Sequence, residues 1–393
     1  MSELPGSLKA SYDAVVVGGG PVGAAAALEL HAAGFDIVLL EARPPGAASD
    51  DLRPLALSHG SRLILERLGV WEGLDPATPI ERIHISHRGR LGRAVFTAAE
   101  ARLPALGYVV DYRGLVAALG RALDAAGVPV LRGASVTSLA HDKTSARLEL
   151  ATSEGPRECI ASLVIVADGS AASTAIDVRE TDYGQSALTA LVTTDRPHTR
   201  TAYERFTPDG PLALLPLASA YALVWTLPPA EAQALSEASP AHFIEVLQGR
   251  FGERAGRFVA VRARAVHRVV LRVAERTTAG RTVLIGNAAQ ALHPVAGQGF
   301  NLGLRDAWEL ASAMRDRGAG AEDLLETYRA RRRIDRTGGI GFTHALVRLF
   351  SNDWLPLAAA RGAGLMLVDC LPPVKDFVVR RMVFGYVRPN VRK

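Results

Sequence analysis

Near the start of the chain, two short apolar runs flank a segment with the pattern of a helix. Ala14 to Val17 is a short apolar run, typical of a buried parallel strand. Ala24 to Ala33 has the character of a helix that stops at Gly34, and Phe35 to Leu40 is a second apolar run that ends at Glu41. This order of strand, helix and strand predicts a parallel βαβ unit.

Two later apolar runs end in turns and predict further strands. They are LVIVADGS at 163–170 and TVLIGNAA at 282–289. From Gly299 onward, GFNLGLRDAWELASAM has apolar residues at spacings of two to four, which predicts a helix. The later of the two runs therefore leads through a glycine-rich loop to a helix N-terminus.

The turn after the first predicted strand has the spacing of a dinucleotide site. Gly18, Gly20 and Gly23 form G-x-G-x-x-G, in which the first glycine permits a tight turn, the second lets a pyrophosphate approach, and the third lets helix and strand pack closely. The carboxylate of Glu41 can accept hydrogen bonds from ribose hydroxyls. The alternative is that these glycines form only a turn in a βαβ unit and bind no dinucleotide. The complete order of elements favours NAD or FAD, and the acid disfavours NADP.

The late loop favours FAD over NAD, because a flavin extends beyond the first βαβ unit and must be held by distant segments. Free N–H groups at a helix start would there face negative charge on the reduced flavin. We expect the helix to begin near Asn301 and Pro294 to fix the approach of the loop. We expect Gly299 to need either a positive φ or close approach to the ring. The sequence has no second strand-linked glycine motif, which disfavours disulfide reductases.

The composition of the chain limits the kinds of protein and partner that we expect. The chain has 393 residues, 48% hydrophobic and 22% charged residues, and a net charge of +5, which are ordinary values for a globular protein. No zinc-like Cys/His spacing, RNP box or lysine-rich run accompanies the positive charge, so we expect neither a metal site nor a nucleic-acid partner. Cys159 and Cys370 lie far apart, and the N-terminus lacks the pattern of a secretory signal. Both features predict a cytoplasmic protein.

Six segments carry a resemblance to a known family. GGGPVGAAAALEL, LRPLALSHGS, DYRGLVAAL, VADGS, ERFTPDGPLALLPL and GNAAQALHPVAGQGFNLGLRD span residues 13–306. They are similar to segments of the single-component flavin-dependent aromatic hydroxylases. The sequences ERFTPDGPLALLPL and HPVAGQGFNLGLRD resemble those of the ubiquinone-biosynthesis branch of this family, and within it those of the hydroxylases of 2-octaprenyl-6-methoxyphenol.

The resemblance implies an α/β architecture with a discontinuous first domain. A Rossmann-type FAD-binding domain would comprise 1–75, 106–178 and 277–330, and a mostly antiparallel β-sheet substrate domain would comprise 76–105 and 179–276. A helical C-terminal region would cover 331–393. The turn signal from Pro208 to Gly210 predicts a hairpin in the substrate domain, whose sheet would form one wall of the substrate cavity.

The resemblance also implies a reaction. NAD(P)H, a transient electron donor, would reduce FAD, O₂ would add to form a flavin C4a-hydroperoxide, and an OH group would pass to a polyprenylated phenol. Three alternatives stay open. They are hydroxylation of another aromatic substrate or ring position, flavin-dependent reduction of prenyl chains without O₂, and a non-catalytic role as the FAD-binding subunit of a biosynthetic complex.

Roles of individual residues follow from the same resemblance. Arg53 would lie near the isoalloxazine ring, Arg113 would reach the FAD pyrophosphate, and Asp168 would connect FAD binding to nicotinamide binding. The expected cofactor contacts are Gly18, Gly20, Pro21, Val22, Gly23, Glu41, Ala42, Arg43, Arg53, Arg113, Val136, Asp168, Gly169, Gly286, Asn287, Ala288, Pro294, Gly297, Gln298, Gly299, Asn301 and Leu302. Asn287 replaces the usual aspartate, and Ile176 or a neighbour stands where an arginine is frequent, which bears on how NAD(P)H is held.

Arg53 and His293 are the candidate catalytic residues. Arg53 could instead be a surface arginine in a proline-rich loop, and His293 a structural histidine before proline. As a catalytic group, His293 would sit beside the flavin and the substrate hydroxyl with a pKa in the useful range. His59, His84 and His87 have no such context and are expected on the surface or in the core. The sequence identifies no side-chain base for the phenol.

The last segments of the chain are basic and amphipathic. YRARRRIDR, IGFTHALVRLF and VKDFVVRRMVFGYVRPNVRK could be helices packed on the body, with their arginines in solvent. They could equally dock on the inner membrane, from which a polyprenyl substrate would arrive. The nearby apolar stretch LPLAAARGAGLMLVDCL is interrupted by Arg361 and Asp369 and is too short to span a bilayer. A complex with other enzymes of ubiquinone biosynthesis is a further expected partner.

Overall fold

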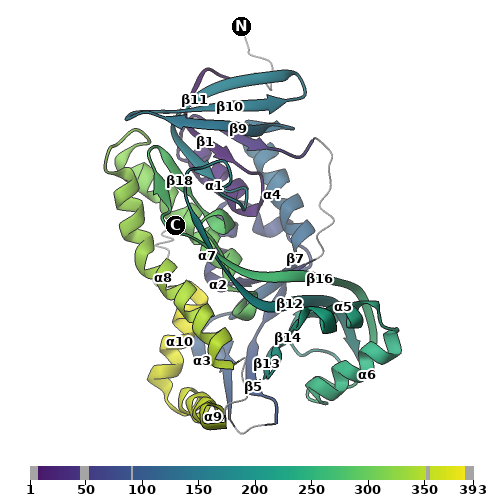
Figure 1. Cartoon of the computed structure of the whole chain (residues 1–393). Helices are drawn as coiled ribbons and strands as arrows, with labels where there is room; N and C mark the ends of the chain where they lie inside the picture. Colours follow the sequence, from purple (N-terminus) through teal and green to yellow (C-terminus); the bar gives the residue numbers. More distant parts are fainter. Residues whose placement is uncertain (1–7, 45–52, 90–91, 351–354, 386–393) are drawn as a thin grey trace.

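The computed structural model describes residues 8–44, 53–89, 92–350 and 355–385. Two sheet-based bodies lie one above the other and are joined by long strands, with the C-terminal helices along one side (Figure 1). The helices are α1 Pro21–Ala32, α2 His59–Arg67, α3 Ala98–Ala101, α4 Tyr112–Ala126, α5 Pro229–Glu237, α6 Pro240–Phe251, α7 Gln298–Arg317, α8 Leu324–Phe350, α9 Leu355–Cys370 and α10 Pro372–Phe384.

The first sheet is parallel at its centre, as the βαβ pattern predicts. Its strands are β1 Ser11–Val17, β2 Ile37–Glu41, β8 Val130–Arg132, β9 Ser135–His141, β10 Ala146–Thr152, β11 Gly155–Val166, β17 Thr278–Ala279 and β18 Thr282–Leu284. The parallel order is β18-β11-β1-β2-β8. Val17 pairs with Val166 and Leu40, and Val166 pairs with Leu284. The turns that follow these strands therefore open at one edge of the sheet, where α/β folds bind ligands.

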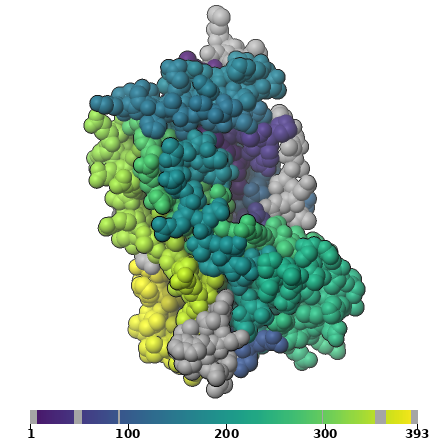
Figure 2. All heavy atoms as spheres, in the orientation of Figure 1, coloured from purple at the N-terminus to yellow at the C-terminus, as the bar shows by residue number. Residues whose placement is uncertain are grey.

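Both faces of the first sheet are covered. One face packs against α1, α4 and α7 in an apolar core that includes Leu39, Ile165, Leu304 and Met314. The alanines of α1 are buried, and their small side chains bring α1 close to α7. The other face packs beneath the antiparallel strands β9 and β10, which form one end of the molecule (Figure 2).

The second sheet builds the other body. Its order is β19-β16-β12-β15-β14-β13-β5-β6. The strands are β5 Arg82–His87, β6 Arg93–Thr97, β12 Val178–Thr194, β13 Thr201–Thr207, β14 Gly210–Leu217, β15 Ala220–Leu227, β16 Phe258–Ala274 and β19 Gln290–Ala291. The predicted hairpin is present, because Thr207 pairs with Gly210 across the turn. The β13–β5 pair is parallel, an exception to the otherwise antiparallel sheet. No hairpin joins β5 to β13, since the two strands come from distant segments of the chain.

One face of the second sheet is closed by α5 and α6, which pack on Trp225, Leu223 and Phe258. The opposite face turns toward the first body. A small third sheet lies between the two bodies and consists of β3 Pro54–Ser58, β7 Gly107–Asp111 and β4 Thr78–Ile80.

The C-terminal region is helical, as expected, but it does not begin at a break in the chain. The boundary expected at residue 330 falls inside α8, which packs along α7. The periodicity of this stretch continues through the boundary, so the tail is a direct extension of the FAD-domain helices. Within the described residues, no helix combines the length and apolar character needed to cross a membrane.

Candidate active site

A cavity of about 990 Å³ extends from the open edge of the first sheet to the second sheet. At one end it is lined by Gly18, Gly19, Gly20, Pro21, Val22, Glu41, Ala42 and Arg43. Its middle is lined by Arg53, Tyr112, Val136, Asp168, Gly169, Asn287, His293, Pro294, Gly297 and Gly299. Its far end is mostly apolar and is lined by Ile83, Ile85, Phe96, Ala202, Phe206, Ala213, Leu215, Val224, Leu346, Leu365 and Val378, together with Tyr203 and Glu204. Segments distant in sequence thus share one elongated space.

The glycine turn after β1 has the geometry that a pyrophosphate needs. Gly18 has φ +103°, and a Cβ there would lie 2.6 Å from the Cα of Asp168. A Cβ at Gly23 would lie 2.0 Å from the carbonyl oxygen of Gly18, so this glycine lets α1 meet the strand. A Cβ at Gly20 would meet no atom within 4 Å. The open space at Gly20 fits a ligand that approaches the backbone at the start of α1.

Glu41 ends β2 and stays ionised in its buried position. Its carboxylate accepts hydrogen bonds from the Arg43 backbone N–H at 2.9 Å and from the Arg43 guanidinium at 3.0 and 3.1 Å. Burial opposes ionisation, but hydrogen bonds from Arg43 and Gly19 outweigh it and hold the pKa of Glu41 below its usual value. An ionised acceptor at this point fits the hydroxyls of a ribose.

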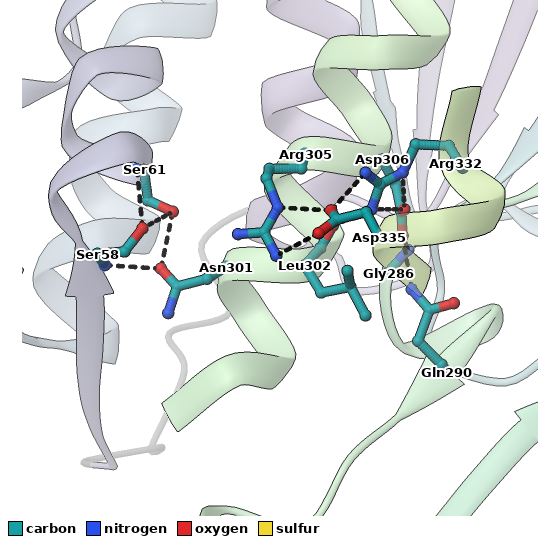
Figure 3. A network of polar contacts seen from close by, with 10 residues as sticks. All are labelled: Ser58, Ser61, Gly286, Gln290, Asn301, Leu302, Arg305, Asp306, Arg332 and Asp335. Carbon is teal, nitrogen blue, oxygen red and sulfur yellow. Dashed lines mark hydrogen bonds and ion pairs between the residues drawn. The ribbon is translucent and has the colours of Figure 1, made fainter. Parts of the chain in front are cut away.

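A buried polar network positions the late turn at Gly286 (Figure 3). Gly286 has φ +60° and begins a short helical turn, and its N–H donates to Asp306 Oδ2 at 3.1 Å. Gln290 Nε2 donates to the same oxygen at 2.6 Å, and Arg332 Nε donates to Asp306 Oδ1 at 2.8 Å. Asn287, the next residue in the turn, lines the cavity.

The same network joins α7 to α8. Arg332 Nη1 donates to Asp335 Oδ2 at 2.6 Å, and Arg305 Nε donates to that oxygen at 2.7 Å. Two arginines and two aspartates are thus buried together with balanced charge. Breaking such a set from one side leaves a buried charge without its partner, which is strongly destabilising.

The helix after the late loop begins earlier than the sequence indicated. α7 starts at Gln298, and its N-cap is Gly297 with φ +59° and no side-chain cap. No side chain caps this helix start, so its N-terminus can face a ligand. Gly299 was expected to need either a positive φ or close approach to the flavin ring. The positive φ is wrong, and within the protein a Cβ there would come no closer than 4.0 Å to Leu292, whereas close approach to the flavin ring stays a prediction.

Asn301 has a structural use for its side chain. Its Oδ1 accepts hydrogen bonds from Ser58 N at 2.8 Å and Ser61 Oγ at 2.7 Å (Figure 3). Its Nδ2 donates to the carbonyl oxygens of Ala56 and Gly297. These bonds fix the first turn of α7 against β3 and α2. Asn301 therefore positions the helix start rather than offering its amide to the cavity.

His293 lines the cavity, but its pKa differs from the expected useful range. Its ring is fully buried, and burial lowers its pKa to about 4. Nδ1 accepts a hydrogen bond from the backbone N–H of Val295 at 3.0 Å, so we assign the proton of the neutral ring to Nε2. At neutral pH His293 is thus a hydrogen-bond donor with little capacity to accept a proton.

The other expected site residues fall into two groups. Arg53 lines the cavity, and its guanidinium lies 5.8 Å from the centre of the Tyr112 ring. Arg113 is exposed on the first turn of α4 and is absent from the lining, whereas its neighbour Tyr112 is part of it. The residues that lie behind the lining are Gly23, Gly286, Ala288 and Leu302, and Gln298 borders a small adjacent hollow. Ile176, at the departure from the family pattern, is buried in the core.

Sequence reasoning missed several polar residues of the cavity, among them Tyr112, Tyr203, His267, Arg268 and Glu204. Glu204 is an acid at the far end. It lies on β13 between Ala202 and Phe206, and all three contribute to the lining. The alternation of the strand was visible in AYERFT, but only the fold reveals which of its faces meets the cavity.

Comparison with known proteins agrees with this geometry. Residues 11–336 match the FAD binding domain family. The chain belongs to this family. It is 36% identical to the ubiquinone hydroxylase UbiL of Rhodospirillum rubrum, over 96% of this chain and 90% of that protein. It is 34% identical to the 3-demethoxyubiquinol 3-hydroxylase of Escherichia coli, over 90% of this chain and 94% of that enzyme.

A solved structure shares the fold. The p-nitrophenol 4-monooxygenase PnpA of Pseudomonas putida superposes with a TM-score of 0.75 at 20% identity, covering 98% of this chain and all of that one. The resemblance to flavin-dependent hydroxylases of the ubiquinone branch is confirmed, and the chain is an FAD-dependent monooxygenase.

Proposed function

We propose that this enzyme hydroxylates the ring of a polyprenylated phenol in ubiquinone biosynthesis, with NAD(P)H as electron donor and O₂ as oxidant. One observation carries the proposal: a single cavity connects the glycine turn at Gly18 with an apolar chamber around Ile85, Phe96 and Leu365. A ring held in the middle of this cavity could place its prenyl chain in the apolar end.

Bound FAD would supply the redox chemistry, by accepting hydride from the nicotinamide and activating O₂. The protein would hold it at four places. Gly18 to Gly20 would face the pyrophosphate, Glu41 would hold the ribose, and Asp168 and Asn287 would line the path toward the ring. The uncapped N-terminus of α7 would stabilise negative charge on the reduced cofactor.

The proposal is tested with the purified, FAD-loaded enzyme and a geranylated methoxyphenol as probe. We expect O₂ consumption and NAD(P)H oxidation that depend on the phenol, together with a product that carries one additional oxygen atom. NAD(P)H oxidation that proceeds equally without O₂ would instead identify a reductase. A protein that consumes neither in the presence of this phenol, or of a second geranylated phenol, would contradict the proposal.

We further propose that the C-terminal helices dock on a membrane surface from which the substrate enters. α9 exposes Met366 and Leu367 to 52% and 55%, while Leu365 and Val368 of the same helix line the cavity. α10 repeats this arrangement, with Phe377 exposed to 57% and Val378 in the lining. These helices therefore lie between the cavity and the surface and present apolar side chains to both, next to the exposed charges of Asp376 and Arg380 on α10, as expected of a surface that docks on a membrane.

Vesicle binding tests the docking surface. The double variant Met366→Asp/Phe377→Asp should lose sedimentation with anionic phosphatidylglycerol vesicles, while Val259→Asp, on an equally exposed residue of β16, should retain it. Equal binding by both variants would show that the helices are not the contact. Cytoplasmic location and membership of a ubiquinone-biosynthesis complex remain predictions.

A further inference from the structure

We propose that Glu204 is the proton acceptor for the phenol hydroxyl of the substrate. The inference rests on the proposed function, since it requires a phenol in the cavity. It supplies the side-chain base that sequence reasoning could not identify.

Glu204 lies at the centre of β13 with its side chain on the cavity face. Its neighbours across the sheet are Ala213 on β14 and Ile85 on β5, and both line the same cavity. Arg205, the next residue along the strand, is absent from this lining and borders a separate hollow with His84 and Arg254. The sheet thus presents one carboxylate to the apolar chamber and keeps the adjacent arginines on its other face.

The carboxylate has no partner within the described part of the chain. Oε1 of Glu204 is buried without a hydrogen bond, and no ion pair or side-chain hydrogen bond involves this residue. The other acids of the lining are engaged: Glu41 binds Arg43, and Asp168 accepts a hydrogen bond from Ser170 N at 2.9 Å. An unpaired carboxylate in an apolar wall destabilises the fold, so we infer that its partner is a polar group of the substrate.

The titratable side chain of the lining nearest to Glu204 in sequence is Tyr203, the preceding residue of β13, and the others lie in other parts of the cavity. The strands on either side of β13 contribute only apolar side chains to the lining near Glu204, and the C-terminal helices contribute Phe342, Leu346, Leu365, Val368, Val378 and Met382. His267 and Arg268 are on β16, which is separated from β13 by four strand spacings, or about 19 Å along the sheet. The remaining groups, Arg43, Arg53, Tyr112 and His293, belong to the cofactor end and the middle of the cavity.

Burial also adjusts the carboxyl for this task, since it raises the pKa of Glu204 to about 7. A base is most effective when its pKa lies near the working pH. In the proposed step, the phenol O–H bond breaks, the proton moves to the Glu204 carboxylate, and the electron pair stays on the phenol oxygen. The electron-rich ring then receives the OH group derived from O₂, with NAD(P)H as reductant. The ring carbon loses its hydrogen to water as a proton, and the Glu204 carboxylic acid returns its proton to the ring oxygen.

The test compares Glu204→Gln with Glu149→Gln, a control that makes the same chemical change at an exposed strand position of the first body. With a geranylated methoxyphenol, kcat of Glu204→Gln should fall about a hundredfold or more, the range typical of a lost general base, with a smaller change in KM. FAD content should be unchanged. The fall of wild-type kcat below about pH 7 should be absent from the variant.

A second phenol separates proton transfer from pocket shape. A ring-fluorinated geranylated phenol that is already ionised at the assay pH needs no base, so the deficit of Glu204→Gln should shrink to less than about tenfold. A deficit equally large for both phenols, or a variant with wild-type kcat, would overturn the inference. A wild-type enzyme that hydroxylates neither phenol would instead overturn the proposed function.

Discussion

The carboxylate of Asp306 on α7 accepts a hydrogen bond from the backbone N–H of Gly286 at 3.1 Å. This contact explains why a glycine-rich loop can hold a defined shape. Gly286 supplies the left-handed turn at the end of β18, and Asp306 fixes that turn to the helix that the loop itself begins. Arg332 then holds Asp306 from α8, so the cofactor end of the cavity depends on a helix outside the nucleotide motif.

Replacement of Asp306 should therefore affect both stability and cofactor binding. In Asp306→Ala the free energy of unfolding should fall by about 3–5 kcal/mol, because Arg332 is left buried with one partner fewer. FAD affinity should also fall, because the Gly286 turn is released. Urea denaturation and flavin fluorescence measure the two effects.

The control for this change is Asp316→Ala. Asp316 also lies on α7 and pairs with an arginine of α8, Arg331, but it is exposed. Asp316→Ala should lower the free energy of unfolding by less than about 1 kcal/mol and leave FAD affinity unchanged. Similar losses in the two variants would contradict the role assigned to the buried network.

Gly297 and Gly299 should respond differently to alanine. Gly297 has a positive φ, and a Cβ there would lie 3.0 Å from the Cβ of Ala56, so Gly297→Ala should lower the free energy of unfolding by about 1–2 kcal/mol. Gly299 has room for a methyl group, so Gly299→Ala should change stability by less than about 0.5 kcal/mol.

The added methyl of Gly299→Ala would nevertheless enter the cavity at the first turn of α7. We expect it to lower the reduction potential of the bound flavin and slow its reduction by NAD(P)H. Melting curves and flavin potentials, measured on both variants, separate the two positions. A Gly299 variant with lost stability and an unshifted potential would argue that the loop is only a connector.

Glu41 provides a test of the first βαβ unit. Glu41→Gln keeps the shape of the side chain but removes the charge that strengthens hydrogen bonds to the ribose, worth about 1.5–3 kcal/mol each. FAD should bind at least about tenfold more weakly, as measured by quenching of flavin fluorescence. The control is Asp36→Asn. Asp36 is an exposed acid that precedes the same strand and pairs with Lys9, and this variant should bind FAD normally. An unaffected dissociation constant for Glu41→Gln would mean that the ribose lies elsewhere.

The features that the sequence predicted well are those that depend on residues close together in the chain. The βαβ unit, the hairpin before Gly210 and the turn at Gly286 are encoded by local patterns of apolar residues and glycines. The start of α7 was placed a few residues late, because the left-handed cap at Gly297 depends on the contacts of Asn301 with β3. The partner of Asp306 could not be foreseen, since Arg332 lies on a different helix. Glu204 was missed because strand alternation does not reveal which face meets a cavity.

The buried carboxyl of Glu204 should make stability depend on pH. Its pKa is raised from 4.5 to about 7, so between these values the folded protein retains a proton that the unfolded chain has released. The contribution of this group to the free energy of unfolding therefore falls as pH rises through that window. In Glu204→Gln the penalty is absent. As pH rises from about 5 to about 8, the free energy of unfolding of the variant should increase relative to that of wild type by on the order of 2 kcal/mol. Urea denaturation of the FAD-loaded, substrate-free proteins measures the difference, with Glu149→Gln as a control that should show none. A stability difference that stays constant with pH would mean that Glu204 is ionised throughout, and would remove the energetic argument that its partner is missing.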